Sequence, residues 1–213
     1  MPTPRPSRRS FFALPFFAAA WPAFAARSMV VTVLGDSITA GYGLPAKAAL
    51  PNQLHLALNR LGVANVVRAA GVSGDTTAGG LGRVDFSVQK DTDLAIVALG
   101  ANDLLQGQDP RRTRANLDGI LKKLKARRIG VLLAGITAPV EVGGGYARDF
   151  NGVFTGLAKV HGVPLYPNLI EGVARRRDLN QPDGIHPNAK GAQIIAARLA
   201  PMVVRALARR SLP

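Results

Sequence analysis

Hydrophobic runs of strand length alternate with helix-periodic segments along most of this 213-residue chain. Runs rich in Val, Leu and Ile predict strands over 29–34, 63–70, 94–99, 129–136 and 163–166. Apolar residues three and four positions apart predict helices over 46–60, 76–90, 111–128, 146–161 and 187–209. Alternating strands and helices form a parallel sheet, because right-handed crossovers place helices on both of its faces. We therefore predict an α/β fold, a single-domain flavodoxin-like three-layer α/β/α sandwich with a five-stranded parallel sheet.

The amino-terminal end of the chain has a different pattern. Arg8 and Arg9 precede the apolar run 11–21, and an Ala-Phe-Ala stretch with the spacing that signal peptidase requires follows it. This run is too short to span a bilayer, which takes about 20 residues. We therefore predict a cleaved export signal at 1–25, a mature domain at 26–213, and a periplasmic or secreted protein. The stretch Ser-Arg-Arg-Ser-Phe-Phe resembles a twin-arginine signal, and a Sec signal that carries two arginines stays open as the alternative.

Composition narrows the classes of partner. Lys and Arg number 27 and Asp and Glu 13, which gives a formal net charge of +14. A nucleic-acid binder would fit this charge, but aromatic interleaving and a known binding motif are missing, and the export signal argues against it. Attraction to an anionic membrane surface and a merely solvated basic surface both stay open. The absence of cysteine excludes disulfides, Cys-ligated zinc, iron–sulfur clusters and an acylated-cysteine anchor.

Polar motifs follow the first three predicted strands, and a fourth lies near the carboxyl terminus. They are GDSITAGYG at 35–43, GVSGDT at 71–76, GAND at 100–103 and DGIHPN at 183–188. In parallel α/β sheets, ligands bind outside the carboxyl ends of the strands. We therefore expect all four motifs to meet at one edge of the sheet.

The residue types in these motifs fit acyl transfer. A serine hydroxyl is a weak nucleophile that needs a base, and the base needs a third group to orient it. We predict Ser37 as nucleophile, His186 as general base and Asp183 as the orienting acid. A tetrahedral oxyanion needs preorganised donors, for which the N–H groups of Ser37 and Gly74 and the Asn102 amide are the candidates.

Each of these residues also has a structural interpretation. Ser37 could be a helix N-cap, Asn102 a turn residue, and Asp183 a residue that shapes its turn. The convergence of four motifs favours the chemical interpretation over these. For Asp36 we predict a capping and hydrogen-bonding role. The glycines at 143–145 predict a flexible loop over the cleft.

Taken together, the motifs resemble those of the SGNH (GDSL-type) hydrolases, whose name records the residues Ser, Gly, Asn and His. Ser37, Gly74, Asn102 and His186 stand in these four places in order, and Asp183 is in the family's acid position. GDSxxAGYG, SGDTxxxGLxR and DGIHPN are similar to the small bacterial periplasmic thioesterase I, lysophospholipase and arylesterase branch. The resemblance covers essentially the whole mature chain.

The resemblance implies the SGNH hydrolase fold and a serine esterase that hydrolyses carboxylic esters through an acyl-enzyme. Aryl esters, lysophospholipids and the thioesters of acyl-CoA are the substrate classes it leaves open. It implies no metal, no organic cofactor and a monomer. The branch often has GGNDGLRG where this chain has GANDLLQG, so Leu104 and Gln106 replace a glycine and an arginine beside the acyl site. We expect Leu104, Gln106, Val140 and Glu141 to bind substrate.

Two other functions stay open at this stage. A carbohydrate O-acetylesterase has the same fold and would act only on acetyl groups. A non-catalytic lipid- or glycan-binding protein could use the same scaffold, although the complete set of catalytic residue types argues against it.

Overall fold

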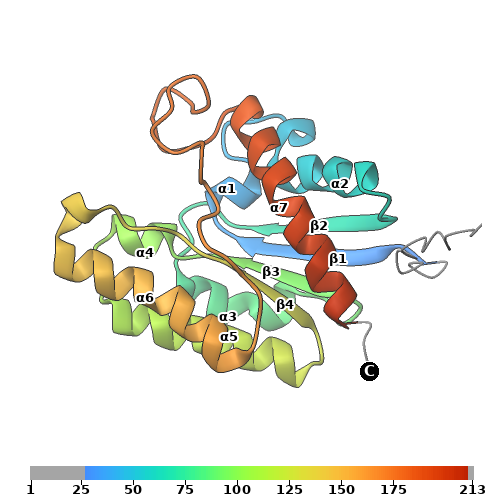
Figure 1. Cartoon of the computed structure of the whole chain (residues 1–213), viewed down its shortest axis with the longest axis horizontal. Helices are drawn as coiled ribbons and strands as arrows, with labels where there is room; N and C mark the ends of the chain where they lie inside the picture. The colour runs from blue at the N-terminus through green and yellow to red at the C-terminus, as the bar shows by residue number, and fades with distance from the viewer. Residues whose placement is uncertain (1–26, 211–213) are drawn as a thin grey trace, which may run out of the picture.

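The computed structural model describes residues 27–210, so the predicted export signal at 1–25 lies outside the described residues. Five strands form one parallel sheet in the order β2-β1-β3-β4-β5, which confirms the predicted sheet (Figure 1). The strands are β1 (Met29–Gly35), β2 (Asn65–Gly71), β3 (Leu94–Ala98), β4 (Gly130–Ala134) and β5 (Leu165–Tyr166).

Helices cover both faces of this sheet and complete three layers. They are α1 (Ser37–Ala40), α2 (Leu50–Arg60), α3 (Thr77–Ser87), α4 (Ala101–Leu105), α5 (Pro110–Ala126), α6 (Gly144–His161) and α7 (Ala189–Arg210), with 3-10 turns η1 (Ala46–Ala48) and η2 (Val140–Val142). Helices α2 and α7 pack together on one face, and α3, α5 and α6 pack side by side on the other (Figure 1).

The core follows from the position of each strand in the sheet. Strand β3 lies between β1 and β4, and all five of its residues are buried. A strand covered on both faces needs a continuous apolar run, which is what Leu94–Ala98 provides. Strand β2 is an edge strand and is largely exposed or half-buried.

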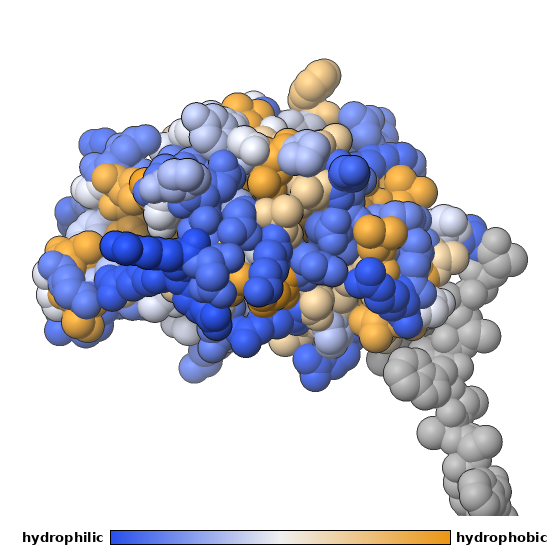
Figure 2. All heavy atoms as spheres, turned by 90° about the horizontal axis from the view of Figure 1, so that it is seen from above, coloured by the Kyte–Doolittle hydropathy of each residue, from blue (hydrophilic) through white to orange (hydrophobic). Residues whose placement is uncertain are grey.

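Helix α7 is long and apolar enough to cross a membrane by length and composition. Half of the relevant segment is nevertheless buried inside the protein, and α7 packs against α2. Figure 2 looks onto this side of the molecule, where hydrophilic residues predominate and hydrophobic ones are scattered. These features are typical of a helix that covers the core of a globular domain.

Most predicted elements differ from the structure by a few residues at their ends, and the predictions at 46–60 and 143–145 differ in kind. The helix predicted from 46 instead begins at Leu50, after η1 and the extended residue Ala49, because Pro51 has no N–H and fits only the first turn of a helix. The loop predicted at 143–145 is wrong for its last two glycines, since α6 begins at Gly144. The short elements α1, α4 and η2 were not predicted.

The carboxyl ends of β1, β2 and β3 lie side by side and position the candidate site. Gly35 of β1 pairs in register with Gly71 of β2 and Ala98 of β3, so the segments that follow start side by side. A Cβ on Gly71 would lie 2.3 Å from the backbone nitrogen of Ala40. Glycine at this position therefore allows α1 to pack directly on the end of β2.

Candidate active site

Ser37 is the first residue of α1, directly beyond the end of β1. The preceding Asp36 is the N-cap, and its Oδ1 accepts a hydrogen bond of 3.0 Å from the Ile38 N–H. Gly41 ends the helix in the left-handed region, with φ of 74°. The predicted capping role of Asp36 is confirmed, and the tight turn places Ser37 at the carboxyl edge of the sheet.

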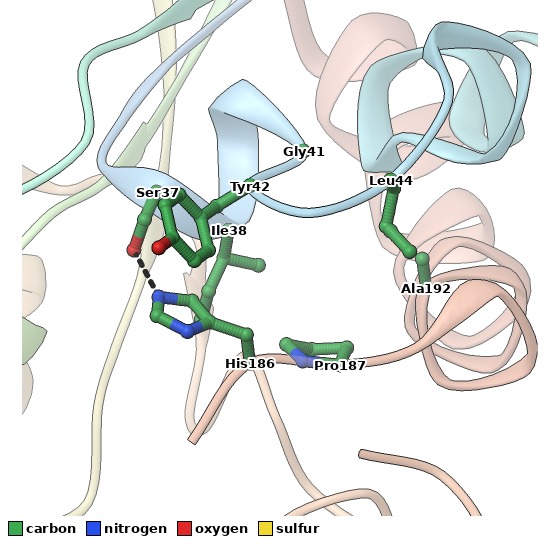
Figure 3. Close-up of a pocket in the computed structure, with 8 residues that line it drawn as sticks. All are labelled: Ser37, Ile38, Gly41, Tyr42, Leu44, His186, Pro187 and Ala192. Atoms are coloured by element: carbon green, nitrogen blue, oxygen red, sulfur yellow. Dashed lines mark hydrogen bonds between the residues drawn. The ribbon is translucent and has the colours of Figure 1, made fainter. Parts of the chain in front are cut away.

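Three side chains form one hydrogen-bonded chain at this edge. His186 Nε2 lies 2.9 Å from Ser37 Oγ, and His186 Nδ1 lies 2.7 Å from Asp183 Oδ2. Figure 3 shows the Ser37 hydroxyl and the His186 ring pointing toward each other. With the Nδ1 proton donated to the carboxylate, neutral imidazole has Nε2 free to accept the Ser37 proton.

Asp183 is held ionised by the turn that contains it. Its carboxylate accepts hydrogen bonds from the backbone N–H and the imidazole of His186 and from the Ile185 N–H, and these lower its pKa to about 2. Charge-assisted hydrogen bonds stabilise the carboxylate form. Asp183 is therefore ionised at neutral pH. Its hydrogen bonds to His186 fix the orientation of the imidazole ring.

The predicted oxyanion donors meet beside Ser37. Gly74 has φ of 80°, and no atom lies within 4 Å of the position its Cβ would take. Asn102 donates one amide hydrogen to the Asp75 carbonyl at 2.9 Å, which leaves the second hydrogen available. Within residues 27–210, the backbone N–H groups of Ser37 and Gly74 donate to no other protein group. Ser37, Gly74 and Asn102 line the same cavity, so three N–H donors without another acceptor belong to residues of its wall.

The guanidinium of Arg83 in α3 forms hydrogen bonds with the backbone and the Asp75 side chain around these donors. Its Nε donates to Asp75 Oδ2 at 2.7 Å, and its Nη atoms donate to the carbonyls of Ala70 at 2.9 Å and Gly35 at 2.8 Å. These contacts join the ends of β1 and β2 to the loop that carries Gly74. No role was predicted for Arg83, although it is the last residue of the SGDTxxxGLxR pattern.

Burial gives Asp36 an unusual carboxyl group. Its side chain is buried, and this desolvation raises the pKa to about 6, against opposing effects of its backbone hydrogen bonds and of His186. Burial disfavours the charged form of a carboxyl group. Ionisation of Asp36 at neutral pH therefore costs folding free energy. Asp36 lies next to the hydrogen-bonded chain of Ser37, His186 and Asp183.

A cavity of about 240 Å³ opens next to Ser37 and His186. It is lined by Asp36, Ser37, Ile38, Tyr42, Ser73, Gly74, Ala101, Asn102, Leu105, Ile185 and His186. The Tyr42 ring also packs against the His186 ring, with centroids 4.7 Å apart (Figure 3). Tyr42 and Leu105 were not predicted as contributors to this cavity.

None of the four residues predicted to bind substrate lines this cavity. Leu104 packs against the hydrophobic core, and Gln106 contacts Gln108, because successive side chains of α4 point in different directions. Val140 is exposed, and Glu141 forms an ion pair with Arg175 at 3.3 Å. These four residues therefore lie outside the cavity beside Ser37, and Leu105, not Leu104, contributes to its wall.

We also searched residues 27–210 for side chains that could bind a metal ion. Within the described part of the chain, no three His, Asp or Glu side chains gather closely enough to hold one. The site instead combines a serine, an imidazole and a carboxylate with three open N–H donors. A hydrogen-bonded Ser, His and Asp at the carboxyl edge of a parallel sheet is typical of hydrolases that act through a serine nucleophile.

Comparison with known proteins identifies the family. Residues 33–194 match the GDSL-like Lipase/Acylhydrolase family. Thioesterase 1/protease 1/lysophospholipase L1 of Escherichia coli K12 is 36% identical over 177 residues, which cover 83% of this chain and 84% of that protein. An arylesterase of Vibrio mimicus is 34% identical over 82% of this chain and 88% of its own length.

Solved structures agree with this match. AlinE4, an SGNH-hydrolase family esterase, is 43% identical, with a TM-score of 0.71 over 85% of this chain and 97% of its own. The structure of TesA is 32% identical, with a TM-score of 0.78 over 84% of this chain and 99% of its own. The chain belongs to the GDSL-like lipase/acylhydrolase family and is a serine-type carboxylic ester hydrolase.

Proposed function

We propose that Ser37, His186 and Asp183 are the catalytic triad of this ester hydrolase. The observation that carries the proposal is the unbroken hydrogen-bonded chain from Asp183 Oδ2 through the imidazole to Ser37 Oγ. In this mechanism Ser37 Oγ attacks the carbonyl carbon and its proton passes to His186 Nε2. The carbonyl oxygen becomes an oxyanion.

The open donors described above receive that oxyanion. They are the N–H groups of Ser37 and Gly74 and the free amide hydrogen of Asn102. When the tetrahedral intermediate collapses, the bond to the leaving oxygen breaks and His186 gives its proton to the leaving alcohol. Water then attacks the acyl-enzyme, again with His186 as base, and releases the acid and free Ser37. A thioester follows the same steps with sulfur as the leaving atom.

We further propose that the cavity beside Ser37 receives the acyl group. Its volume of about 240 Å³ and the side chains of Ile38, Leu105 and Ile185 on its wall support an acyl group longer than acetyl. Aryl esters, lysophospholipids and acyl-CoA thioesters are the substrate classes proposed on this basis. The relatives named thioesterase, lysophospholipase and arylesterase support the same range.

Hydrolysis of 4-nitrophenyl esters from acetyl to dodecanoyl, by the parent protein and Ser37→Ala, tests this function. We expect activity beyond butanoyl that disappears in Ser37→Ala. Ser37-dependent activity confined to the acetyl ester would replace the acyl-chain hydrolase with a carbohydrate O-acetylesterase. A folded protein without activity that also fails to react with a fluorophosphonate would support a binding protein.

We also propose that the protein is exported to the periplasm or the medium and acts as a monomer without a cofactor. The basic residues and apolar run within 1–25 support export, with a twin-arginine signal favoured by Arg8 and Arg9. Detection of mature chains that start at Ala26 in a periplasmic extract, and their loss when Arg8 and Arg9 become lysines, would support this route.

A further inference from the structure

The turn that carries Asp183 and His186 lies at the surface of the domain. Residues 182–185 are exposed, and His186 is only half-buried. Such a turn gains little stability from the hydrophobic core, yet His186 stays within hydrogen-bond distance of Ser37, 149 positions earlier in the chain. We define the His186 turn as residues 180–187. Its position must depend on contacts outside the core.

Backbone hydrogen bonds fix the internal shape of the His186 turn. Asn180 and Pro187 pair as an isolated antiparallel bridge. The N–H of Gln181 donates to the His186 carbonyl at 2.8 Å, and the N–H of Gly184 donates to the Gln181 carbonyl at 2.9 Å. All of these contacts join residues of the turn to one another, so none of them fixes the turn relative to the nucleophile.

The side chain of Gln181 joins this turn to the segment that carries the nucleophile. Its Nε2 donates to the Tyr42 carbonyl at 2.7 Å and to the Pro187 carbonyl at 3.0 Å. Tyr42 lies just beyond α1, and its N–H donates to the Ser37 carbonyl at 3.0 Å. One amide group therefore binds the neighbour of His186 to a residue that is itself hydrogen-bonded to Ser37.

Few other contacts connect the two segments. Among the described residues, two hydrogen bonds join the His186 turn to the segment 36–44, and the one besides that of Gln181 is the bond between His186 and Ser37. The Tyr42 ring also packs against the His186 ring, with centroids 4.7 Å apart (Figure 3). The Gln181 amide thus supplies the hydrogen bond that supports both contacts of the imidazole.

Gly43 leaves room for the Gln181 amide. Its φ of 72° lies in the left-handed region, which favours glycine. A Cβ on Gly43 would lie 2.2 Å from Gln181 Oε1 and would push the amide away. This position therefore has two reasons to be glycine, and the second concerns Gln181 alone.

The Gln181 contact adds little to the core of the domain. Tyr42 is 54% exposed, and neither Tyr42 nor Gln181 belongs to the buried hydrophobic cluster. Gln181 also does not line the cavity beside Ser37. Loss of its amide therefore acts on the placement of the His186 turn rather than on the core.

We propose that Gln181 is a positioning residue that holds the His186 imidazole against Ser37 Oγ, by binding the His186 turn to the chain just beyond α1. The proposal rests on the catalytic triad proposed above and adds a residue outside it. The Ser37 proton can pass to His186 Nε2 only at hydrogen-bond distance, and a displacement of about 1 Å can lower the rate about 10²-fold.

Steady-state hydrolysis of a 4-nitrophenyl ester by the parent protein and Gln181→Met tests this proposal. Methionine has nearly the same length as glutamine but no N–H to donate. We expect kcat to fall about 10²-fold with little change in KM, while thermal unfolding shows that the variant is folded. In His186→Ala, the addition of Gln181→Met should change the residual rate by less than about twofold, because the group that Gln181 positions is absent.

The variants Gly43→Ala and Gly62→Ala are a matched pair that leaves Gln181 itself in place. Gly62 has φ of 76°, and no atom lies within 4 Å of the position its Cβ would take. Both substitutions strain a left-handed residue, but only Gly43→Ala displaces the Gln181 amide. We therefore expect the loss of kcat in Gly43→Ala and not in Gly62→Ala.

Three results would overturn the proposal. They are a parent-like kcat in folded Gln181→Met, an equal loss when Gln181→Met is added to His186→Ala, and equal kcat values in the two glycine variants. If Gln181→Met does not fold, the glycine pair decides. Failure of the proposed triad would appear separately, as full activity in His186→Ala alone.

Discussion

The substitution Asp36→Asn separates the stability of the fold from the chemistry of the site. Asp36 is buried, caps α1 and lies near His186. Asparagine has nearly the same shape, and its Oδ1 can accept the same hydrogen bond from the Ile38 N–H. The substitution therefore removes a buried charge while it keeps the cap.

The magnitude follows from the raised pKa of Asp36. Its value of about 6, against an ordinary 3.8, means that the folded chain binds this proton more tightly than the unfolded chain. The contribution of Asp36 to stability is therefore highest below pH about 4, falls as pH rises through about 6, and stays lower above it. At 1.36 kcal/mol per pH unit the cost approaches about 3 kcal/mol at pH 8. Asp36→Asn avoids this cost, which corresponds to roughly 5–10 °C in Tm.

Thermal unfolding of both proteins at pH 4 and pH 8 is the assay. We expect a higher Tm for Asp36→Asn at pH 8 and a difference near zero at pH 4, together with a lower kcat, because the variant lacks a negative charge beside the protonated His186. Asp109→Asn is the matched control, since Asp109 also caps a helix, but Arg111 lowers its pKa. A Tm difference for Asp36→Asn that does not depend on pH would refute the reasoning.

Three further predictions address the backbone and the oxyanion donors. In steady-state kinetics, Arg83→Gln should lower kcat about 10²-fold with little change in KM, because without the guanidinium the loop that carries Gly74 is misplaced. Arg83→Lys should recover part of this loss. Asn102→Ala should lower kcat about 10²–10³-fold at unchanged Tm, and a loss below about threefold would remove Asn102 from the oxyanion site. Gly71→Ala should lower the free energy of unfolding in urea by about 3 kcal/mol or more, whereas Gly82→Ala, which meets no atom within 4 Å, should not destabilise the protein.

The sheet and the meeting of the polar motifs could be predicted because both depend on periodicity and chain direction. Parallel strands bring their carboxyl ends to one edge, so Ser37, Gly74 and Asn102 had to lie close together once the strands were identified. His186 and Asp183 are neighbours within one turn. These relations need no knowledge of side-chain packing.

The lining of the acyl cavity could not be predicted in this way. Adjacent residues of a helix point about 100° apart, so the short α4 directs Leu104 into the core and Leu105 into the cavity. Nothing in the local pattern of the sequence distinguishes the two leucines. The contacts of Arg83 likewise depend on carbonyl groups that come together only when β1 and β2 pair.

The central claim is that Ser37 is the nucleophile, and covalent labelling tests it most directly. We predict that a fluorophosphonate adds once per chain, that peptide mass spectrometry places the adduct on Ser37, and that esterase activity falls in proportion to labelling. Ser37→Ala should neither take the label nor hydrolyse esters. Full esterase activity in Ser37→Ala, or an activity-abolishing adduct on another residue, would contradict the account.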